Sequence, residues 1–237
     1  MNRGPILITI NDLAFGGGQR TVVEEANELS SRGFDVYVLV TLKGGKSDLA
    51  QKLRIPHAKR VSIPFNSPFD LTGHGALRAF LRKTKPSTII SNLYFTNTIT
   101  RLSKLYFPSA RIIVREGNVP REKSYRTSLV DCILSVFTYR VISNSESGRR
   151  ALRFETLFTK TGVLYNGVDG QFFREIDPVR KQAERAKRGV KEGEVIFLSA
   201  GSLVPKKGHR VLIEAFAKLK GQPALLIAGE GYLKDEL

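Results

Sequence analysis

A strand, a glycine-rich loop and a helix follow one another near the start of the chain, and this order constrains the fold most strongly. Residues 6–10 form a short apolar run that predicts a buried strand. Three consecutive glycines, Gly16, Gly17 and Gly18, come next, and apolar residues then recur at helical spacing. Residues 36–41 predict the following strand. This βαβ order predicts two parallel strands joined by a right-handed connection.

The same alternation continues over roughly the first 165 residues. The further predicted strands are residues 61–63, 87–91, 111–114 and 140–143. The predicted helices are residues 76–83, 97–107 and 128–137. The strands are apolar and β-branched with little alternation, which is typical of a parallel sheet covered by helices on both faces. We therefore expect an α/β fold with a doubly wound parallel sheet.

A second α/β unit is predicted after a turn cluster at residues 166–170. Residues 178–191 carry six Lys/Arg against one Glu, and the alternation then restarts. It runs through a strand at 195–199, a loop at 201–208, a helix at 211–219 and a strand at 224–228. We place the domains at 1–169 and 170–237. Because two strands and one clear helix leave a parallel sheet uncovered, we expect a fragment of a longer protein or a chain that needs a partner.

The charge of the chain indicates an anionic partner without choosing one. Lys and Arg number 38 against 22 Asp and Glu, a net charge of +16. Nucleic acid, an acidic membrane face and a phosphorylated ligand all fit this charge, although the basic stretch lacks the interleaved aromatics of single-strand binders. A lone cysteine, Cys132, makes no intramolecular disulfide, and no apolar run is long enough to span a membrane. We expect a cytoplasmic protein.

Two loops suit a phosphate group. The three glycines follow a strand and open a helix, so their backbone N–H groups and the helix N-terminus can face an anion. They match neither the dinucleotide fingerprint nor a P-loop, and a flexible turn is the alternative. The loop Gly201–Gly208, with Lys207, has the same position in the second unit, where solvated lysines are the alternative. Such loops in two units predict a ligand cleft between domains.

Candidate catalytic groups are few. Glu116 follows a strand, where catalytic groups of parallel sheets gather, but it is equally explained as a partner of Arg115 or Arg121. No Ser/His/Asp or Cys/His arrangement is evident. The three histidines are scattered without metal-ligand spacing, and we expect them to be exposed. They are His57, His74 and His209.

Four segments in this order give the chain a family resemblance. They are Gly16–Arg20 before the first helix, Asn166–Asp169 at the domain crossing, Gly201–Gly208, and Gly229–Gly231. Together they resemble the family-4 glycosyltransferases, retaining enzymes of the GT-B fold that use nucleotide-sugar donors. The resemblance covers a full N-terminal, acceptor-side domain and the first part of a nucleotide-sugar-binding domain.

The resemblance implies a set of binding residues. They are Gly16, Gly17, Gly18, Asn118, Gly201, Ser202, Lys207 and Glu230. Lys207 matches a diphosphate-binding lysine, and Ser202 stands where many members have Arg. Asn118 lies in a segment, 115–120, that is similar to a Glu-Arg-Asn segment of some subfamilies. A pair of glutamates that holds the donor in the family would lie beyond Leu237, so we expect little turnover from these 237 residues.

The function implied by the resemblance is hexosyl transfer from a UDP- or GDP-sugar to a glycan or polyprenyl-phosphate-linked acceptor, in cell-surface polysaccharide synthesis. No cofactor and no metal are implied. The positive charge suits peripheral contact with the inner, anionic face of the membrane, and no specific nucleic acid is expected. The alternative is a non-catalytic α/β protein that binds a nucleotide or a polyanion.

Overall fold

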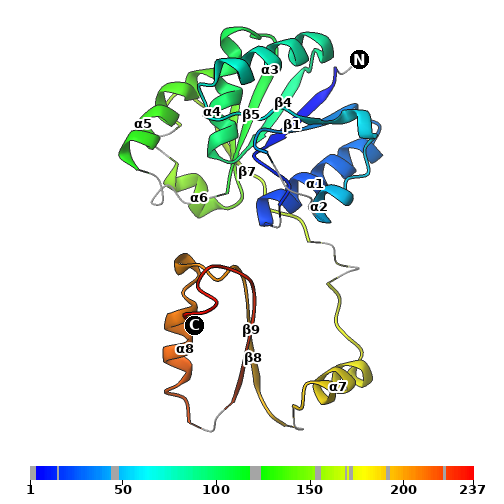
Figure 1. The fold of residues 1–237 in the computed structure, drawn as a ribbon, viewed down its shortest axis with the longest axis vertical. Helices are drawn as coiled ribbons and strands as arrows, with labels where there is room; N and C mark the ends of the chain where they lie inside the picture. Colours follow the sequence, from blue (N-terminus) through cyan, green and yellow to red (C-terminus); the bar gives the residue numbers. More distant parts are fainter. Residues whose placement is uncertain are drawn as a thin grey trace. The chain divides into compact units, whose positions relative to one another are not determined.

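A computed structural model describes most of the chain (Figure 1). The described residues are 4–14, 16–43, 48–117, 124–152, 156–168, 170, 173–190, 193–220 and 223–237. The chain divides into two compact units, Met1–Gly167 and Val168–Leu237. The predicted boundary after residue 169 stays a prediction, since Asp169 lies outside the described residues.

The first unit contains a seven-stranded parallel sheet. Its strands are β1 (Ile6–Ile10), β2 (Val36–Val40), β3 (Arg60–Ser62), β4 (Thr88–Asn92), β5 (Arg111–Glu116), β6 (Arg140–Ser143) and β7 (Thr161–Val163). They lie in the order β3-β2-β1-β4-β5-β6-β7. The order reverses between β1 and β4, which is the switch point where doubly wound sheets bind ligands. The predicted fold class is confirmed.

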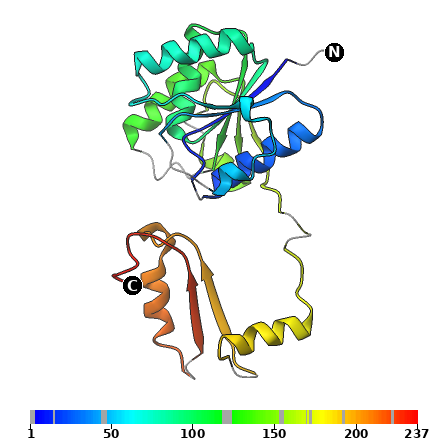
Figure 2. The ribbon, with the colours of Figure 1, turned by 45° about the vertical axis from the view of Figure 1, so that its right-hand side comes forward.

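Helices cover both faces of this sheet (Figure 2). They are α1 (Gly17–Ser31), α2 (Asp48–Gln51), α3 (Leu71–Thr84), α4 (Tyr94–Leu102), α5 (Tyr125–Leu134) and α6 (Glu146–Ala151). Short 3-10 turns are η1 (His57–Lys59), η2 (Ser103–Leu105) and η4 (Ser135–Phe137). The helix predicted at 97–107 ends at Leu102, because the chain tightens into η2 ahead of Pro108. The short elements α2, α6 and β7 were not predicted.

Two separate apolar layers hold the unit together. On one face, Ile8 and Ile10 of β1 pack with residues of α1 and α2. On the other face, Leu7 of β1 packs with Leu77 of α3 and Ile99 of α4. Alternate residues of one strand therefore point into opposite layers, which explains why β1 is apolar without a polar face.

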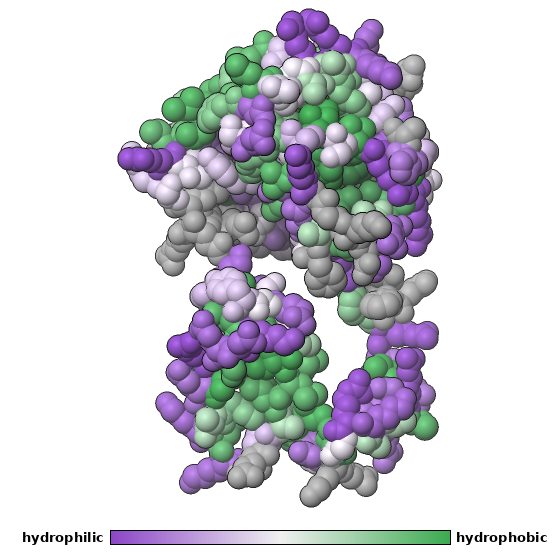
Figure 3. All heavy atoms as spheres, viewed as in Figure 1, coloured by the Kyte–Doolittle hydropathy of each residue, from purple (hydrophilic) through white to green (hydrophobic). Residues whose placement is uncertain are grey.

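The second unit has a two-stranded parallel sheet. Its elements are α7 (Pro178–Lys187), β8 (Ile196–Ala200), η5 (Pro205–Lys207), α8 (His209–Phe216) and β9 (Ala224–Ala228). The basic stretch is thus largely α7, which begins after the capping carboxylate of Asp177. Phe197 and Leu198 of β8 point to opposite faces and are 45% and 69% exposed. Figure 3 shows apolar side chains over β8 and β9, so this sheet is incompletely covered, as predicted.

Candidate functional site

The glycine loop of the first unit lies at the switch point of the sheet. Gly16 precedes the first turn of α1, whose N–H groups have no acceptor four residues back. A Cβ added at Gly17 would meet no atom within 4 Å, and one at Gly18 would lie 3.7 Å from Leu93 Cδ2. The space beside the Gly17 backbone is therefore empty, and a ligand can approach the backbone there. The binding role of the three glycines stays a prediction.

The turn after β4 carries backbone strain beside this loop. Leu93 has a φ of 70°, in a region that costs a non-glycine residue about 1–3 kcal/mol. The preceding residue, Asn92, donates from Nδ2 to the carbonyl of Thr9 across the sheet at 3.2 Å. The end of β4 is thus fixed against β1, and the strained turn faces the start of α1.

The loop between β1 and the glycines is also anchored. The carboxylate of Asp12 accepts hydrogen bonds from the backbone N–H of Ala14 at 2.9 Å and from Gln19 Nε2 at 3.2 Å. Thr96 donates to Asn11 Oδ1 at 2.5 Å. These bonds fix the loop between β1 and α1. None of them uses an N–H group of the first turn of α1.

Glu116 ends β5 and is buried. Asn97 of α4 donates from Nδ2 to Glu116 Oε1 at 3.1 Å. The other amide atom, Asn97 Oδ1, is buried and has no hydrogen-bond partner within the described part of the chain. The carboxylate and the amide oxygen together form an acceptor-rich pair at the carboxyl edge of the sheet. Such a pair suits the hydroxyl groups of a sugar.

The predicted pairing of Glu116 with Arg115 is wrong, because alternate residues of a strand point to opposite faces. Arg115 instead donates to Glu25 Oε2 of α1 at 2.9 Å and to Asn166 Oδ1 at 3.2 Å. It therefore joins α1 to the segment that leaves the first unit. Asn118 and Arg121 lie outside the described residues.

In the second unit, two of the sequence motifs lie against each other. The N–H of Gly201 donates to the carbonyl of Ala228 at 3.0 Å, and that of Leu203 donates to the carbonyl of Glu230 at 2.9 Å. A Cβ added at Gly229 would lie 1.9 Å from the Gly201 carbonyl oxygen. Glycine at 229 is required by this close approach. The side chain of Glu230 forms an ion pair with Lys234, in which Oε1 lies 3.4 Å from Nζ.

Lys207 lies over the end of β8. A Cβ added at Gly201 would be 3.8 Å from Lys207 Cδ. Gly208, with a φ of 69°, turns the chain directly into α8, and Ser202 is exposed in the same loop. The Lys207 ammonium group and the first-turn N–H groups of α8 are therefore available together, and both favour an anion.

The predicted exposure of the histidines is confirmed for His57, whereas His74 is half-buried and His209 is buried. His209, the first residue of α8, is 3% exposed, and neither ring nitrogen has a hydrogen-bond partner among the described residues. His74 lies on α3, where Nε2 is 2.8 Å from the Pro68 carbonyl and Nδ1 is 2.8 Å from the Tyr106 hydroxyl. A carbonyl oxygen can only accept, so Nε2 donates to Pro68. Burial raises the pKa of Tyr106.

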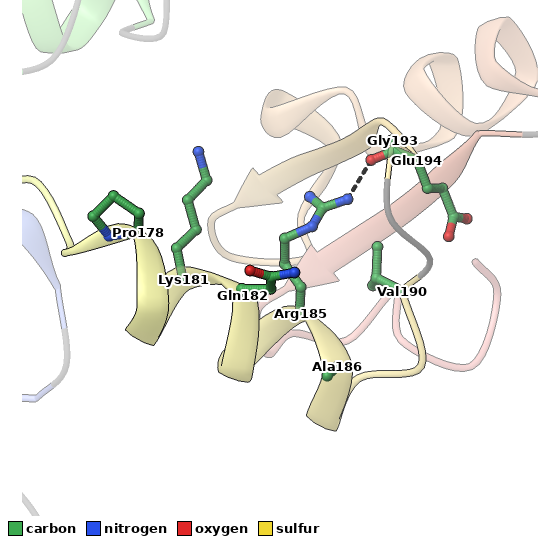
Figure 4. A pocket seen from close by; sticks show the side chains of 8 residues that line it. All are labelled: Pro178, Lys181, Gln182, Arg185, Ala186, Val190, Gly193 and Glu194. Carbon is green, nitrogen blue, oxygen red and sulfur yellow. Dashed lines mark hydrogen bonds between the residues drawn. The ribbon is translucent and has the colours of Figure 1, made fainter.

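An open hollow of about 510 Å³ lies between α7 and the turn before β8 (Figure 4). Lys181 and Arg185 line it, and Arg185 donates to the carbonyl of Glu194. It adjoins the amino end of β8, whereas Lys207 follows the carboxyl end. Ligands of parallel sheets bind at carboxyl ends, so this hollow is not part of the candidate site.

Metal-ligand clusters and membrane-spanning helices are both absent from the residues that the structure describes. No three His, Cys, Asp or Glu side chains in this part of the protein gather as metal ligands would. None of the helices described there has the length and apolarity needed to cross a bilayer.

The fold and these loops define a Rossmann-like protein of two α/β units, each with a glycine-rich loop at the carboxyl edge of a parallel sheet. The chain belongs to Glycosyltransferase Family 4, whose family model matches residues 15–172. A second model, glycosyl transferases group 1, matches residues 180–237.

Curated relatives are longer than this chain. It is 26% identical over 231 residues to the lipopolysaccharide core biosynthesis glycosyltransferase LpsE of Rhizobium meliloti, covering 94% of the chain and 58% of the relative. It is 29% identical over 150 residues to the N-acetylgalactosamine-N,N'-diacetylbacillosaminyl-diphospho-undecaprenol 4-alpha-N-acetylgalactosaminyltransferase of Campylobacter jejuni, covering 60% of the chain and 39% of the relative. The chain thus spans less than two thirds of either protein.

Solved structures share the fold. HepE of Anabaena, determined with UDP and glucose, superposes with a TM-score of 0.78 at 20% identity, over 98% of this chain and 63% of that one. A glycosyltransferase of Rickettsia africae gives a TM-score of 0.72 at 19% identity, over 99% and 62%. These likenesses confirm the GT-B-like fold class.

Proposed function

We propose that this chain carries the acceptor-side domain and the first part of the donor-side domain of a retaining hexosyltransferase. The donor is a UDP- or GDP-sugar, and the acceptor is a glycan or a polyprenyl-phosphate-linked glycan in cell-surface polysaccharide synthesis. Family membership supports the reaction class. The names of the relatives support the acceptor class, since one is named for a diphospho-undecaprenol substrate and another for lipopolysaccharide core synthesis.

The observation that carries the proposal is the position of Lys207. Its side chain lies over Gly201 at the carboxyl end of β8, and Gly208 directs α8 from the same point. A diphosphate bound there would receive the lysine charge and the N–H groups of α8. As the sugar–phosphate bond breaks, the negative charge on the leaving diphosphate grows, and these groups would stabilise it without a metal ion.

The first unit would receive the acceptor. Glu116 and Asn97 present oxygen acceptors at the carboxyl edge of its sheet, and the glycine loop lies at the switch point of the same edge. We assign Glu116 and Asn97 to binding of acceptor hydroxyl groups. We place the protein in the cytoplasm, at the inner membrane face, where lipid-linked acceptors are available.

Nucleotide binding tests the proposal directly. UDP or GDP should raise the melting temperature of the 237-residue chain at fixed salt, as any ligand of the folded state does. Lys207→Ala should weaken nucleotide affinity by about 10-fold or more, since a charged hydrogen bond contributes about 1.5–3 kcal/mol. Lys218→Ala, which removes an equal charge beyond the end of α8, should leave the affinity unchanged.

Two outcomes would contradict the proposal. One is equal nucleotide affinity of Lys207→Ala and Lys218→Ala. The other is a lack of response to UDP and GDP together with steeply salt-dependent binding to DNA or RNA, which would favour the polyanion-binding alternative.

A further inference from the structure

One guanidinium group holds the segment through which the chain leaves the first unit. Arg115 lies on β5, and its side chain is 12% exposed. Its Nη1 donates to Glu25 Oε2 of α1 at 2.9 Å, and its Nη2 donates to Asn166 Oδ1 at 3.2 Å. Because the guanidinium group is planar and rigid, these two bonds fix Asn166 relative to α1.

The bond to Asn166 is the last hydrogen bond that the described residues place between this exit segment and the rest of the first unit. The backbone N–H of Leu164 donates to a carbonyl of β6 at 2.9 Å, and Asn166 follows two residues later. Among the described residues 164–168, Leu164 and Asn166 are the hydrogen-bonded ones. Tyr165 and Val168 are 69% and 73% exposed, so packing contributes little to holding this segment.

The ion pair between Arg115 and Glu25 is better shielded from water than the pair between Arg20 and Glu24 on the same helix. Both side chains of the first pair are less than a fifth exposed, whereas those of the second pair are about half exposed. Dissolved ions screen shielded charges only weakly. The pair with α1 therefore gives Arg115 a firm position from which its second nitrogen holds the exit segment.

We propose that Arg115 is a latch that sets where the connection between the two units begins. With the latch closed, the first unit holds the chain as far as Asn166, one residue before the boundary at Gly167. With the latch open, the last bond is that of Leu164, and residues 165–167 become part of the connection. Since α1 begins in the glycine loop, the latch also joins the helix of that loop to the start of the connection.

The latch can be tested without a substrate, because all of its bonds lie within the first unit. Nitrogen-15 relaxation of the 237-residue chain measures the backbone order parameter, which is about 0.85 in rigid segments and below about 0.6 in flexible ones. In the wild type, Asn166 should have the value of a rigid segment. Arg115→Ala should lower it to the flexible range, and the amide of Leu164 should exchange about 10-fold faster because the end of β7 opens more often.

Two variants separate the latch from the stability of the fold. Asn166→Ala removes the bond to the exit segment and keeps the pair between Arg115 and Glu25. Arg115→Lys keeps the positive charge, but a single ammonium group lacks the forked geometry that reaches both partners. Both variants should lower the order parameter at residues 165–167, and Asn166→Ala should leave the melting temperature close to that of the wild type. The control is Arg111→Ala, at the exposed first residue of β5, which should leave the order parameter unchanged.

Three results would overturn the proposal. The first is an order parameter at Asn166 that is already in the flexible range in the wild type. The second is an order parameter at residues 165–167 that neither Arg115→Ala nor Asn166→Ala changes. The third is an equal decrease in Arg111→Ala. If Arg115→Ala does not fold, the result for Asn166→Ala decides.

Discussion

At the scale of single residues, the buried carboxylate of Glu116 can contribute to the stability of the fold as well as to acceptor binding. Glu116→Ala leaves the Asn97 amide group without this acceptor, and an unsatisfied buried donor costs about 1–3 kcal/mol. Glu116→Gln keeps an oxygen in place, so its free energy of unfolding should stay closer to that of the wild type. Urea denaturation of both variants measures the difference. Equal losses in the two variants would show that the negative charge itself stabilises the fold.

Two glycines of α3 offer a matched pair at the same scale. A Cβ at Gly73 would lie 2.6 Å from Phe65 Cδ1, and that ring is buried in the core. Gly73→Ala should therefore destabilise the chain by about 1–3 kcal/mol through overpacking. A Cβ at Gly75 meets no atom within 4 Å, so Gly75→Ala should stabilise the helix by about 0.5–1 kcal/mol. Changes of the same sign in thermal unfolding would contradict this packing argument.

At the scale of elements, one buried ion pair joins α4 to α5. Arg101 Nη1 donates to Asp131 Oδ1 at 2.5 Å, and Arg101 Nε donates to Thr138 Oγ1 at 2.9 Å. Removing one member leaves the other charge buried without its partner, which typically costs about 3–5 kcal/mol. Asp131→Ala should therefore lower the free energy of unfolding by this amount. Glu24→Ala, which removes an exposed pair with Arg20, should change it by less than about 1 kcal/mol.

The start of α3 depends on pH through its cap. The backbone N–H of Asn66 donates to the Asp70 carboxylate, as do the N–H groups of Gly73 and Thr72, and these bonds hold the pKa of Asp70 below its ordinary value of 3.8. The stabilisation is present above that value and is lost as the pH falls through the lower folded-state pKa. The difference in urea midpoint between wild type and Asp70→Ala should thus be constant from pH 7 to about pH 5 and shrink below about pH 4. A difference that grows in acid would contradict this assignment.

At the scale of the whole molecule, local patterns predicted the elements better than the contacts between them. The parallel strands and the Gly16 and Lys207 loops follow from apolar runs and glycines within short windows. The apolar pattern predicts the start of α3 at residue 76, five residues after its true start at Leu71, although Asp70 is an evident N-cap signal.

Contacts between distant segments have no comparable signal in one sequence. Arg101 with Asp131, Arg115 with Glu25, and Asn97 with Glu116 join residues 30, 90 and 19 positions apart. Each pair becomes visible only when strand order and helix packing are known. Of the two residues that we assign to acceptor binding, the sequence therefore predicts only Glu116, and Asn97 is found from the structure.

The two units differ in how completely their sheets are covered, and this difference should appear in amide hydrogen exchange. In the seven-stranded sheet, with helices on both faces, most residues of β1 and β4 are buried and the others are half-buried. The two strands β8 and β9 leave apolar side chains exposed, and two-stranded sheets are marginally stable in water. Local opening therefore needs less free energy in the second unit.

Amides of β8 and β9 should exchange at least 100-fold faster than those of β1 and β4, a difference of about 2.7 kcal/mol in opening free energy. Mass spectrometry of peptides spanning these strands measures both units in one sample of the intact chain. Saturating UDP or GDP should slow exchange at residues 201–212, where Lys207 and the first turn of α8 lie, and Lys207→Ala should remove that protection. Equal protection of both sheets without nucleotide would show that exposed apolar faces do not set the stability of the second unit.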